Sequence, residues 1–313
     1  MISIGNLVVG GSGKTPVVAS VAQLLQEAGE RPAILSRGYA RRSKARVVVV
    51  NDGTGMAVSA SEAGDEPCML ARALPEVPLV VCASRYEAGR VAEARFGATV
   101  HLLDDGFQHI RLARDIDLLL VSGADLEEAV LPSGRLREPL DAARDADALL
   151  VPGSAADAAR VGDVLGVTTT FSLTPSRGAL RVLAPFTGGP ASTRGTRVVA
   201  VAGIARPARF FDDLRVDGFD VAQSFAFRDH HWFTPHDVQV ACDAALALGA
   251  AGIVTTEKDA VRLEPLLERA ASLGSLPWAC VPYSVRVEPA DRFRTWLLGR
   301  LAHVRRSTSM EPA

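Results

Sequence analysis

The chain has 313 residues, 48% of them hydrophobic, and a formal net charge of -2 at pH 7. That length allows one large or two medium-sized domains with a buried core, and the charge balance argues against a general nucleic-acid-binding protein, which would present a basic face. No stretch approaches the 18 or more apolar residues of a membrane-spanning helix, so we expect a chain that is soluble or attached only at a membrane surface.

The first half of the chain alternates short β-branched apolar runs with helical patterns. The expected strands are residues 2–8, 33–35, 47–50, 79–82, 100–103, 116–121 and 148–151, and the expected helices are residues 16–28, 65–73, 86–96 and 138–144. The strands are continuous apolar runs, as in parallel sheets that are covered on both faces. The alternation predicts an α/β domain over residues 1–166, with a doubly wound, mostly parallel sheet that binds ligands at the carboxyl ends of its strands.

Residues 167–196 are rich in Thr, Ser, Gly and Pro and contain two short strand-like pieces, which predicts a β-ribbon linker. Regular alternation resumes over residues 197–313. Strand-like runs lie at 197–205, near Val221 and within 252–260, and helical patterns follow Pro207 and cover 235–248. This pattern predicts a second, smaller α/β domain, which we expect to close over the active site.

Residues 9–16, VGGSGKTP, follow the first strand and open the first helix, as a phosphate-binding P-loop does. Val8 stands where the pattern G-x-x-x-x-G-K-[ST] has its first glycine, so an ordinary glycine turn is the alternative. Composition favours the P-loop, because only three of the 34 basic residues are lysines and one of them is Lys14. We therefore expect a P-loop NTPase-type domain that binds ATP. The expected nucleotide-binding residues are Gly10, Gly11, Ser12, Gly13, Lys14, Thr15 and Pro16.

A magnesium site is expected beside the P-loop. The Thr15 hydroxyl can bind Mg²⁺, while Lys14 reaches the β- and γ-phosphates. The run HLLDDGFQH delivers Asp104 and Asp105 at the end of a buried strand, where adjacent carboxylates repel each other unless a cation is present. The alternative for this run is an Asp-Gly turn with Asp105 at its corner.

Three other segments allow both a functional and a structural interpretation. In AGDEP, Asp65 either caps a helix or acts in a site. In FRDHHWFTPHD, His230 and His231 cannot easily face one ion, so the choice lies between a single catalytic or hydrogen-bonded histidine and a polar loop before a helix. In TTEKDA, Lys258 either faces the nucleotide base or the substrate, or lies at a capped helix start.

The segment RGYARRSKAR, residues 37–46, concentrates basic side chains. A solvated loop is the interpretation that such charge runs favour. The alternative is a patch that binds an anionic lipid head group or a substrate phosphate.

The motifs follow one another along nearly the whole chain. They read SIGNLVVGGSGKTP (3–16), SRGY (36–39), GDEP (64–67), DDGFQH (104–109), LPSGRLREP (131–139), GIARPARFF (203–211), DHH (229–231) and TTEKDA (255–260). In this combination and order the sequence resembles the tetraacyldisaccharide 4'-kinase (lipid A 4'-kinase) family. Single motifs are weak signals, but the combination is highly specific.

The resemblance implies an ATP-dependent kinase that transfers the γ-phosphate of ATP to the 4'-hydroxyl of tetraacyldisaccharide 1-phosphate in lipid A biosynthesis. It implies catalytic roles for Asp65, His230, Lys14 and Asp105. In this interpretation Asp65 and His230 form a dyad on the acceptor hydroxyl, and His230 is preferred over His231 because the family motif is Asp-His. The implied ligands of Mg²⁺ are Thr15, Asp104, Glu66 and Glu138, the nucleotide also meets Lys258, and the substrate meets Arg37, Tyr39 and Gln108.

The implied partner is the glycolipid substrate. We expect the protein to be a monomer. We expect it to lie in peripheral contact with the cytoplasmic face of the inner membrane, or in the cytoplasm. Family members commonly carry a membrane-associated helix before the first strand, and the present sequence begins within that strand. Two rival interpretations are another P-loop enzyme, such as a carboxylate-activating synthetase, and a nucleotide-switched binding protein. The latter class usually has an additional lysine where this chain has Val8 and Val9.

Overall fold

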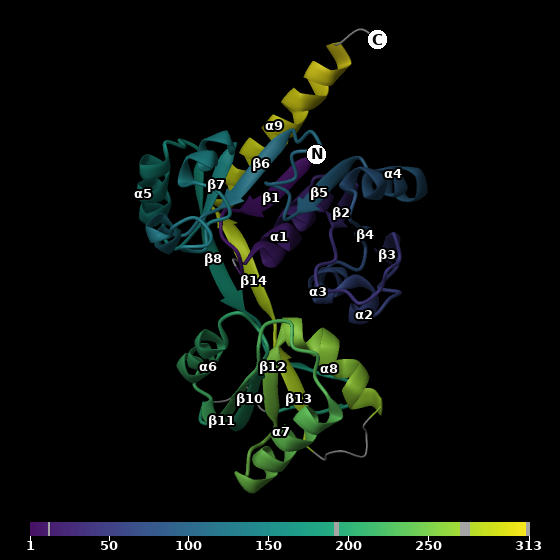
Figure 1. Cartoon of the computed structure of the whole chain (residues 1–313), viewed down its shortest axis with the longest axis vertical. Helices are drawn as coiled ribbons and strands as arrows, with labels where there is room; N and C mark the ends of the chain where they lie inside the picture. The colour runs from purple at the N-terminus through teal and green to yellow at the C-terminus, as the bar shows by residue number, and fades with distance from the viewer. Residues whose placement is uncertain (12, 191–193, 270–275, 311–313) are drawn as a thin grey trace.

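The structure of the chain is a computed structural model that describes residues 1–11, 13–190, 194–269 and 276–310 (Figure 1). Two β-sheets divide it into a larger unit at the top of the view and a smaller unit at the bottom. The large sheet has the strand order β14-β8-β7-β6-β1-β5-β2-β4-β3. Its strands are β1 (Ile2–Asn6), β2 (Pro32–Ser36), β3 (Val47–Asn51), β4 (Leu79–Cys82), β5 (Val100–Asp104), β6 (Ile116–Leu120), β7 (Ala148–Pro152), β8 (Thr170–Arg177) and β14 (Tyr283–Glu288).

The large sheet is doubly wound and mostly parallel, as predicted. Only the outermost pairs, β3 with β4 and β14 with β8, are antiparallel. One face packs against α1 and α9 and the other against α4 and α5, so the central strands are buried on both sides. The helical elements of this unit are α1 (Lys14–Glu27), α2 (Ala60–Ala63), α3 (Asp65–Ala73), α4 (Arg85–Phe96), η1 (Gly123–Glu127), η2 (Leu140–Asp145), α5 (Ala155–Leu165) and α9 (Ala290–Met310).

The smaller unit is also an α/β structure, with the strand order β11-β10-β12-β13-β9. Its strands are β9 (Arg181–Val182), β10 (Arg197–Ala202), β11 (Asp220–Ala226), β12 (Ile253–Thr256) and β13 (Trp278–Val281), and its helices are α6 (Pro207–Val216), α7 (Pro235–Ala247) and α8 (Glu257–Arg269). Helix α7 starts with a capping box between Thr234 and Asp237, which fixes the end of the preceding loop.

The C-terminal part of the chain differs from the expected domain ranges. Residues 197–313 do not all belong to the smaller unit, because β14 pairs with β8 in the large sheet. Helix α9 follows it and buries Phe293, Leu297 and Leu301 in the core of the larger unit. The expected linker 167–196 likewise contributes a strand to each sheet, and the long antiparallel pair β8–β14 runs between the units (Figure 1). Pairing across such a distance has no local sequence signal.

Local differences are smaller. The expected helix 138–144 is the 3₁₀ helix η2, and the expected strand 2–8 ends at Asn6. Among the helices of the described ranges, none combines the length and the apolar character that crossing a membrane requires.

Candidate active site

The P-loop begins where β1 ends. Gly10 and Gly13 have φ values of +96° and +83°, a left-handed conformation that glycine adopts without steric cost. Helix α1 starts at Lys14, so backbone N–H groups at its first turn and the helix dipole form an anion-binding site. Thr15 and Pro16 lie in this first turn, while Ser12 lies outside the described residues.

The valine at the irregular position has a structural reason. Val8 is 4% exposed and forms an isolated antiparallel bridge with Leu136. On either side, the Val9 N–H donates to the Arg135 carbonyl at 2.8 Å and the Arg137 N–H donates to the Leu7 carbonyl at 2.7 Å. The extended backbone and buried side chain suit valine, so the first P-loop glycine is replaced by a residue that ties the loop to the LRE segment.

Lys14 and the Asp-Asp pair meet at the carboxyl ends of β1 and β5. The Lys14 ammonium donates to Oδ1 of Asn6 at 2.8 Å and lies 3.3 Å from Oδ1 of Asp105. Asp105 has a φ of +58°, which is uncommon for a residue other than glycine and recurs at active sites. Burial raises the pKa of Asp105, but Lys14 and Arg137 outweigh burial, and the net direction is downward. Asp105 is therefore an anion held between two cations.

The pKa of the neighbouring Asp104 carboxyl is shifted in the opposite direction to that of Asp105. Asp104 is buried at the end of β5 and accepts a hydrogen bond from Oγ of Ser36 at 3.1 Å. Burial, with a further contribution from Glu66, raises the pKa of its carboxyl to about 7, although Lys14 acts in the other direction. A carboxyl that is hard to ionise, beside other carboxylates, is the arrangement that a divalent cation would relieve.

Mg²⁺ fits this donor set. The expected ligands Thr15, Asp104 and Glu66 offer hydroxyl and carboxylate oxygens, the ligand type that Mg²⁺ prefers. Within the described ranges no three His, Cys, Asp or Glu side chains form a complete metal site. An incomplete protein site is compatible with Mg²⁺, which commonly takes one or two carboxylates together with substrate phosphates and water.

Arg137 was not among the residues predicted for the site. Its guanidinium donates to both carboxylate oxygens of Asp105, at 3.0 and 2.9 Å, and to Oε1 of Gln108 at 3.0 Å. The amide of Gln108 in turn donates to Oε1 of Glu138 at 2.7 Å and to the carbonyl of Asn6 at 3.0 Å. Gln108 and Glu138, which were predicted to meet the substrate and Mg²⁺, thus lie near the end of β1 that leads into the P-loop. In the sequence, the feature that could have indicated Arg137 as a site residue was its position in the LPSGRLREP motif, directly before Glu138.

The second cluster joins the two units. Asp65 is the first residue of α3 and is 4% exposed, and its oxygens lie 3.2 and 3.0 Å from Nδ1 of His230. The N-cap of α3 is Gly64, so Asp65 lies one residue inside the helix, where its Oδ1 accepts a hydrogen bond from the N–H of Glu66 at 3.0 Å. His230 has a φ of +57°, a second strained position in the site. Burial raises the pKa of Asp65, but the hydrogen bond to His230 and the charges of Lys258 and Arg262 bring it below its ordinary value.

Lys258 lies on the far side of His230 from Asp65. Its ammonium is 3.3 Å from Nε2 of His230, 3.1 Å from Oδ1 of Asp229 and 3.4 Å from Oε1 of Glu66. Burial alone would lower the pKa of Lys258, but the carboxylates of Glu66, Asp65 and Asp229 raise it, and the net direction is upward. Lys258 is therefore a charged group of this cluster.

The two adjacent histidines have different surroundings. Nε2 of His231 lies 3.1 Å from Oδ2 of Asp237, and its ring stacks on Phe227 with the ring centres 4.5 Å apart. These contacts hold the start of α7 and lie within the smaller unit. The contacts of His231 therefore stabilise the smaller unit, whereas His230 contacts Asp65 of the larger unit.

A group of cations lies beside the Asp-Asp pair. Burial first, and then the charge of Arg37, lowers the pKa of Arg85, while Asp104 and Asp105 act in the opposite direction. Arg85 is 4% exposed, and its Nε has no hydrogen-bond partner in the described part of the chain. Tyr39, from the same SRGY motif as Arg37, is exposed and meets His230 edge-on, with the ring centres 5.3 Å apart.

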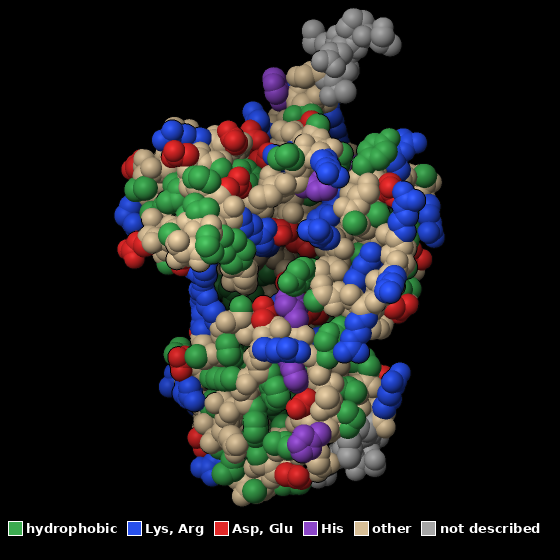
Figure 2. Space-filling view, viewed as in Figure 1, with side chains coloured by type: hydrophobic (Ala, Val, Ile, Leu, Met, Phe, Trp, Pro, Cys, Tyr) green, Lys and Arg blue, Asp and Glu red, His purple; other side chains and the backbone are tan. Residues whose placement is uncertain are grey.

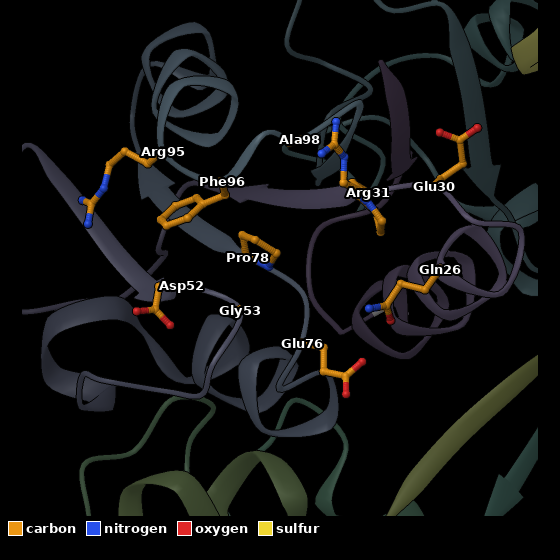
Figure 3. A pocket seen from close by; sticks show the side chains of 11 residues that line it. Gln26, Glu30, Arg31, Asp52, Gly53, Glu76, Pro78, Arg95, Phe96 and Ala98 are labelled. Atoms are coloured by element: carbon orange, nitrogen blue, oxygen red, sulfur yellow. The ribbon is translucent and has the colours of Figure 1, made fainter.

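The contacts of Asp65 with His230 and Arg262 join the two units, and Figure 2 shows a hollow between the units where acidic, basic and histidine side chains gather. A separate cavity of about 350 Å³, lined by Arg31, Asp52 and Glu76 among others, lies elsewhere (Figure 3). It is at the edge of the large sheet where β2 and β4 begin, opposite the P-loop edge. In α/β sheets ligands bind at the carboxyl ends of the strands, so the hollow is the candidate active site.

Comparison with known proteins agrees with the motifs. The model of the family described as tetraacyldisaccharide-1-P 4'-kinase matches residues 1–302. The tetraacyldisaccharide 4'-kinase of Geobacter metallireducens is 43% identical over 278 residues, covering 86% of this chain and 80% of the relative. That of Anaeromyxobacter dehalogenans (strain 2CP-C) is 43% identical over 284 residues, covering 87% of this chain and 74% of the relative.

A crystal structure of LpxK from Aquifex aeolicus in complex with ATP is similar to this chain with a TM-score of 0.73 and 32% identity, covering 96% of this chain and 87% of that one. The P-loop NTPase-like fold and the prediction of an ATP-dependent kinase of lipid A biosynthesis are confirmed by these matches, which favour the kinase over both rival interpretations. The chain belongs to the tetraacyldisaccharide-1-P 4'-kinase family.

Proposed function

We propose that this chain transfers the γ-phosphate of ATP to the 4'-hydroxyl of tetraacyldisaccharide 1-phosphate. The observation that carries the proposal is the contact between Asp65 and His230 across the two units, at the same edge of the sheet as the P-loop lysine. Phosphate would be bound by the P-loop and Lys14, and the acceptor hydroxyl would be bound at the dyad. Phosphoryl transfer needs mainly positioning and charge neutralisation, which these two clusters supply.

The proposed base is Nε2 of His230. The charged Lys258 can donate a hydrogen bond to Nε2 only if that nitrogen carries no proton, so the proton of the neutral ring is on Nδ1 and is donated to Asp65. This tautomer can accept the proton of a hydroxyl group. As the hydroxyl oxygen bonds to the γ-phosphorus and the bond to the β-phosphate oxygen breaks, the hydroxyl proton passes to Nε2 and ADP leaves.

The same geometry suggests how Lys258 takes part. Its ammonium now occupies the position that the acceptor hydroxyl would take beside Nε2. When the hydroxyl binds there, Lys258 can turn to a phosphate oxygen, since Asp229 and Glu66 keep it charged. This proposal is consistent with the expected contact of Lys258 with the nucleotide or the substrate.

We also propose that the enzyme uses Mg²⁺. Thr15, Asp104, Glu66 and Glu138 would hold the ion beside the phosphates, and the ion would neutralise charge on the transferred group. Asp105, held by Lys14 and Arg137, would orient the P-loop lysine toward the phosphates.

Arg37 and Tyr39 are proposed to contact the acceptor, with Arg85 beside them. Burial first, and then the charge of Arg37, lowers the pKa of Arg85; a bound anion would offset this repulsion, and the substrate carries a phosphate. Tyr39 lies against the ring of His230, so a sugar bound at the dyad would lie next to Tyr39. Gln108 is proposed to meet the substrate from the P-loop side.

The smaller unit is proposed to close over this site. Residue Ala205 of the GIARPARFF motif already lies toward the P-loop, since a Cβ added to Gly11 would be 3.5 Å from Cβ of Ala205. The contact of His230 with Asp65, 3.0 Å long in this structure, would belong to the closed state, and closure would exclude water that competes for the phosphate.

Peripheral contact with the cytoplasmic face of the inner membrane, by a monomer, is also proposed. The basic segment 37–46 supports it, although two of its arginines have protein partners: Arg46 pairs with Glu87, and Arg42 lies 4.1 Å from the ring centre of Trp232. Vesicles containing anionic lipid should sediment the protein more than neutral vesicles do, and changing Arg41 and Lys44 to Gln should reduce the difference. Equal sedimentation by both vesicles would contradict the contact, and sedimentation analysis of the protein alone would reveal a dimer.

The function is tested with ATP labelled at the γ-phosphate, Mg²⁺ and tetraacyldisaccharide 1-phosphate, with and without detergent. Label in a bisphosphorylated glycolipid is the expected result, and the Lys14→Met variant should not form that product. Free labelled phosphate without labelled lipid in both conditions would instead indicate an ATPase and overturn the proposal.

A further inference from the structure

Arg262 is a buried cation that the proposed reaction does not yet use. Its side chain is 1% exposed, and it lies on α8 one helical turn after Lys258. One terminal nitrogen, Nη2, donates to the carbonyl of Gly203 at 3.2 Å and to Oδ1 of Asp259. The other, Nη1, lies 3.6 Å from Oδ2 of Asp65, in the larger unit. The guanidinium thus lies between one carboxylate of its own unit and one of the other.

The first of these carboxylates is fixed in place. Asp259 is fully buried, and its Oδ2 accepts hydrogen bonds from the hydroxyl of Thr256 at 2.6 Å and from the N–H of Gly203 at 2.9 Å. The ring of Phe233 lies 5.7 Å from the guanidinium carbon. Asp259 and Gly203 therefore hold Arg262 in one orientation, with Nη1 directed at Asp65.

The contact with Asp65 falls on a particular atom. Oδ2 is the Asp65 oxygen that lies nearer to Nδ1 of His230, at 3.0 Å against 3.2 Å for Oδ1. Both Nη1 and Nε of Arg262 lack a hydrogen-bond partner in the part of the chain that the structure describes. The carboxylate that Nη1 faces is therefore that of Asp65. A buried guanidinium is strongly destabilising unless its charge is compensated, and Asp65 adds to the compensation that Asp259 provides.

Helix α8 therefore contacts the dyad at both ends. Lys258 lies at Nε2 of His230, and Arg262, four residues later, lies at Oδ2 of Asp65. The carboxylate is held from one side by α8 and from the other by the imidazole. A shift of α8 would misplace both ends of the dyad together.

We propose that Arg262 is a positioning residue, which holds Oδ2 of Asp65 against Nδ1 of His230 and so couples α8 of the smaller unit to the dyad. The inference rests on the proposed role of the dyad. It assigns to Arg262 no contact with either substrate. Its effect passes through Asp65, as the aspartate of a catalytic triad acts through the histidine that it orients.

The test compares Arg262→Gln and Arg262→Lys with a matched control, Arg72→Gln. Arg72 on α3 forms an ion pair with Glu264 on α8, so it joins the same two helices without contacting Asp65. For Arg262→Gln we expect kcat to fall about tenfold or more, but by no more than the roughly 10²–10⁴-fold that a general base contributes, while KM for ATP changes less than about twofold. Arg262→Lys should recover part of kcat because it keeps the charge, and Arg72→Gln should stay within about twofold of the parent chain in both constants.

A double-mutant cycle with Asp65→Asn separates positioning from general support of the fold. If Arg262 acts through Asp65, adding Arg262→Gln to Asp65→Asn should cause little further loss of kcat. Independent, multiplying losses, or equal losses in Arg262→Gln and Arg72→Gln, would overturn the inference. If Arg262→Gln does not fold, the folded Arg262→Lys takes its place in the cycle, with the same expected non-additivity. An unchanged kcat in Asp65→Asn alone would instead contradict the dyad, and so the proposed mechanism.

Discussion

Asp65 and His230 are 165 positions apart in the chain, and Oδ2 of Asp65 lies 3.0 Å from Nδ1 of His230. One residue begins a helix of the larger unit, and the other lies in a loop of the smaller unit. Neither unit contains the dyad alone, so its geometry depends on the packing of α3 against the loop 229–231 and α8.

His230→Ala should lower kcat by roughly 10²–10⁴-fold and leave ATP affinity nearly unchanged, because His230 contacts Asp65 and Lys258 and, among the described residues, none of the P-loop. Steady-state kinetics and a nucleotide-binding titration measure the two quantities. His231→Ala is the control, since its contacts are with Asp237 and Phe227, and it should reduce kcat only a few-fold through local packing. Equal loss of kcat and ATP affinity in His230→Ala would contradict the positional argument.

Arg137→Met should impair ATP binding by the group that Lys14, Asp105 and Arg137 form beside the P-loop. Without Arg137 the negative charge of Asp105 is compensated by Lys14 alone, so the ammonium is held away from the phosphates. We expect kcat/KM for ATP to fall by about tenfold or more, the order lost with a charge-assisted hydrogen bond. Arg135→Met is the control on the same segment, because Arg135 pairs with Glu128 instead. A similar loss in both variants would mean that only the segment's structure matters.

Asp104→Asn should change how stability depends on pH. Burial raises the pKa of Asp104 to about 7, so between the unfolded pKa near 4 and pH 7 the folded state binds a proton that the unfolded state has released. Stability is therefore lost as pH rises through this window. Asparagine removes that loss, and the variant should gain on the order of a few kcal/mol relative to the parent chain between pH 4 and pH 8, without added divalent cation.

Urea unfolding at several pH values measures this difference. The control is Asp105→Asn, because the pKa of Asp105 is shifted downward, although burial opposes the shift. Its contribution is present above the unfolded pKa and is lost as pH falls, so the variant should lose stability relative to the parent chain as pH rises. The same pH trend in both variants would contradict the opposite states assigned to the two carboxyls.

Gly38→Ala should destabilise the larger unit. Gly38 has a φ of +71°, and an added Cβ would lie 2.4 Å from Cγ1 of Val81 and 2.7 Å from the carbonyl oxygen of Ala63. Left-handed strain and overpacking together should cost about 2–4 kcal/mol. Gly29→Ala shares the positive φ, at +81°, but its Cβ would meet no atom within 4 Å, so it should cost only about 1 kcal/mol. Thermal unfolding distinguishes the two, and equal costs would rule out the close contact as the cause.

Much of the larger unit followed from the sequence. Continuous apolar runs such as Leu79–Cys82 alternate with helical patterns, and this local signal predicts a doubly wound sheet with the P-loop at the end of β1. The motif order predicted the family, and the Asp-His motif favoured His230 over His231 as the catalytic histidine. These features are local because backbone periodicity and turn chemistry act over a few residues.

The tertiary structure alone decided the long-range relationships. The return of β14 and α9 to the larger unit depends on the pairing of Tyr283–Glu288 with Thr170–Arg177, which no local pattern encodes. The contacts of Arg137 and Arg262 could likewise not be predicted from the sequence, since an arginine in a chain with 34 basic residues has no distinctive spacing. Each is distinguished by its contact with a carboxylate that is distant in sequence, Asp105 for Arg137 and Asp65 for Arg262, and such contacts form only when the chain folds and, for Arg262, when the two units pack together.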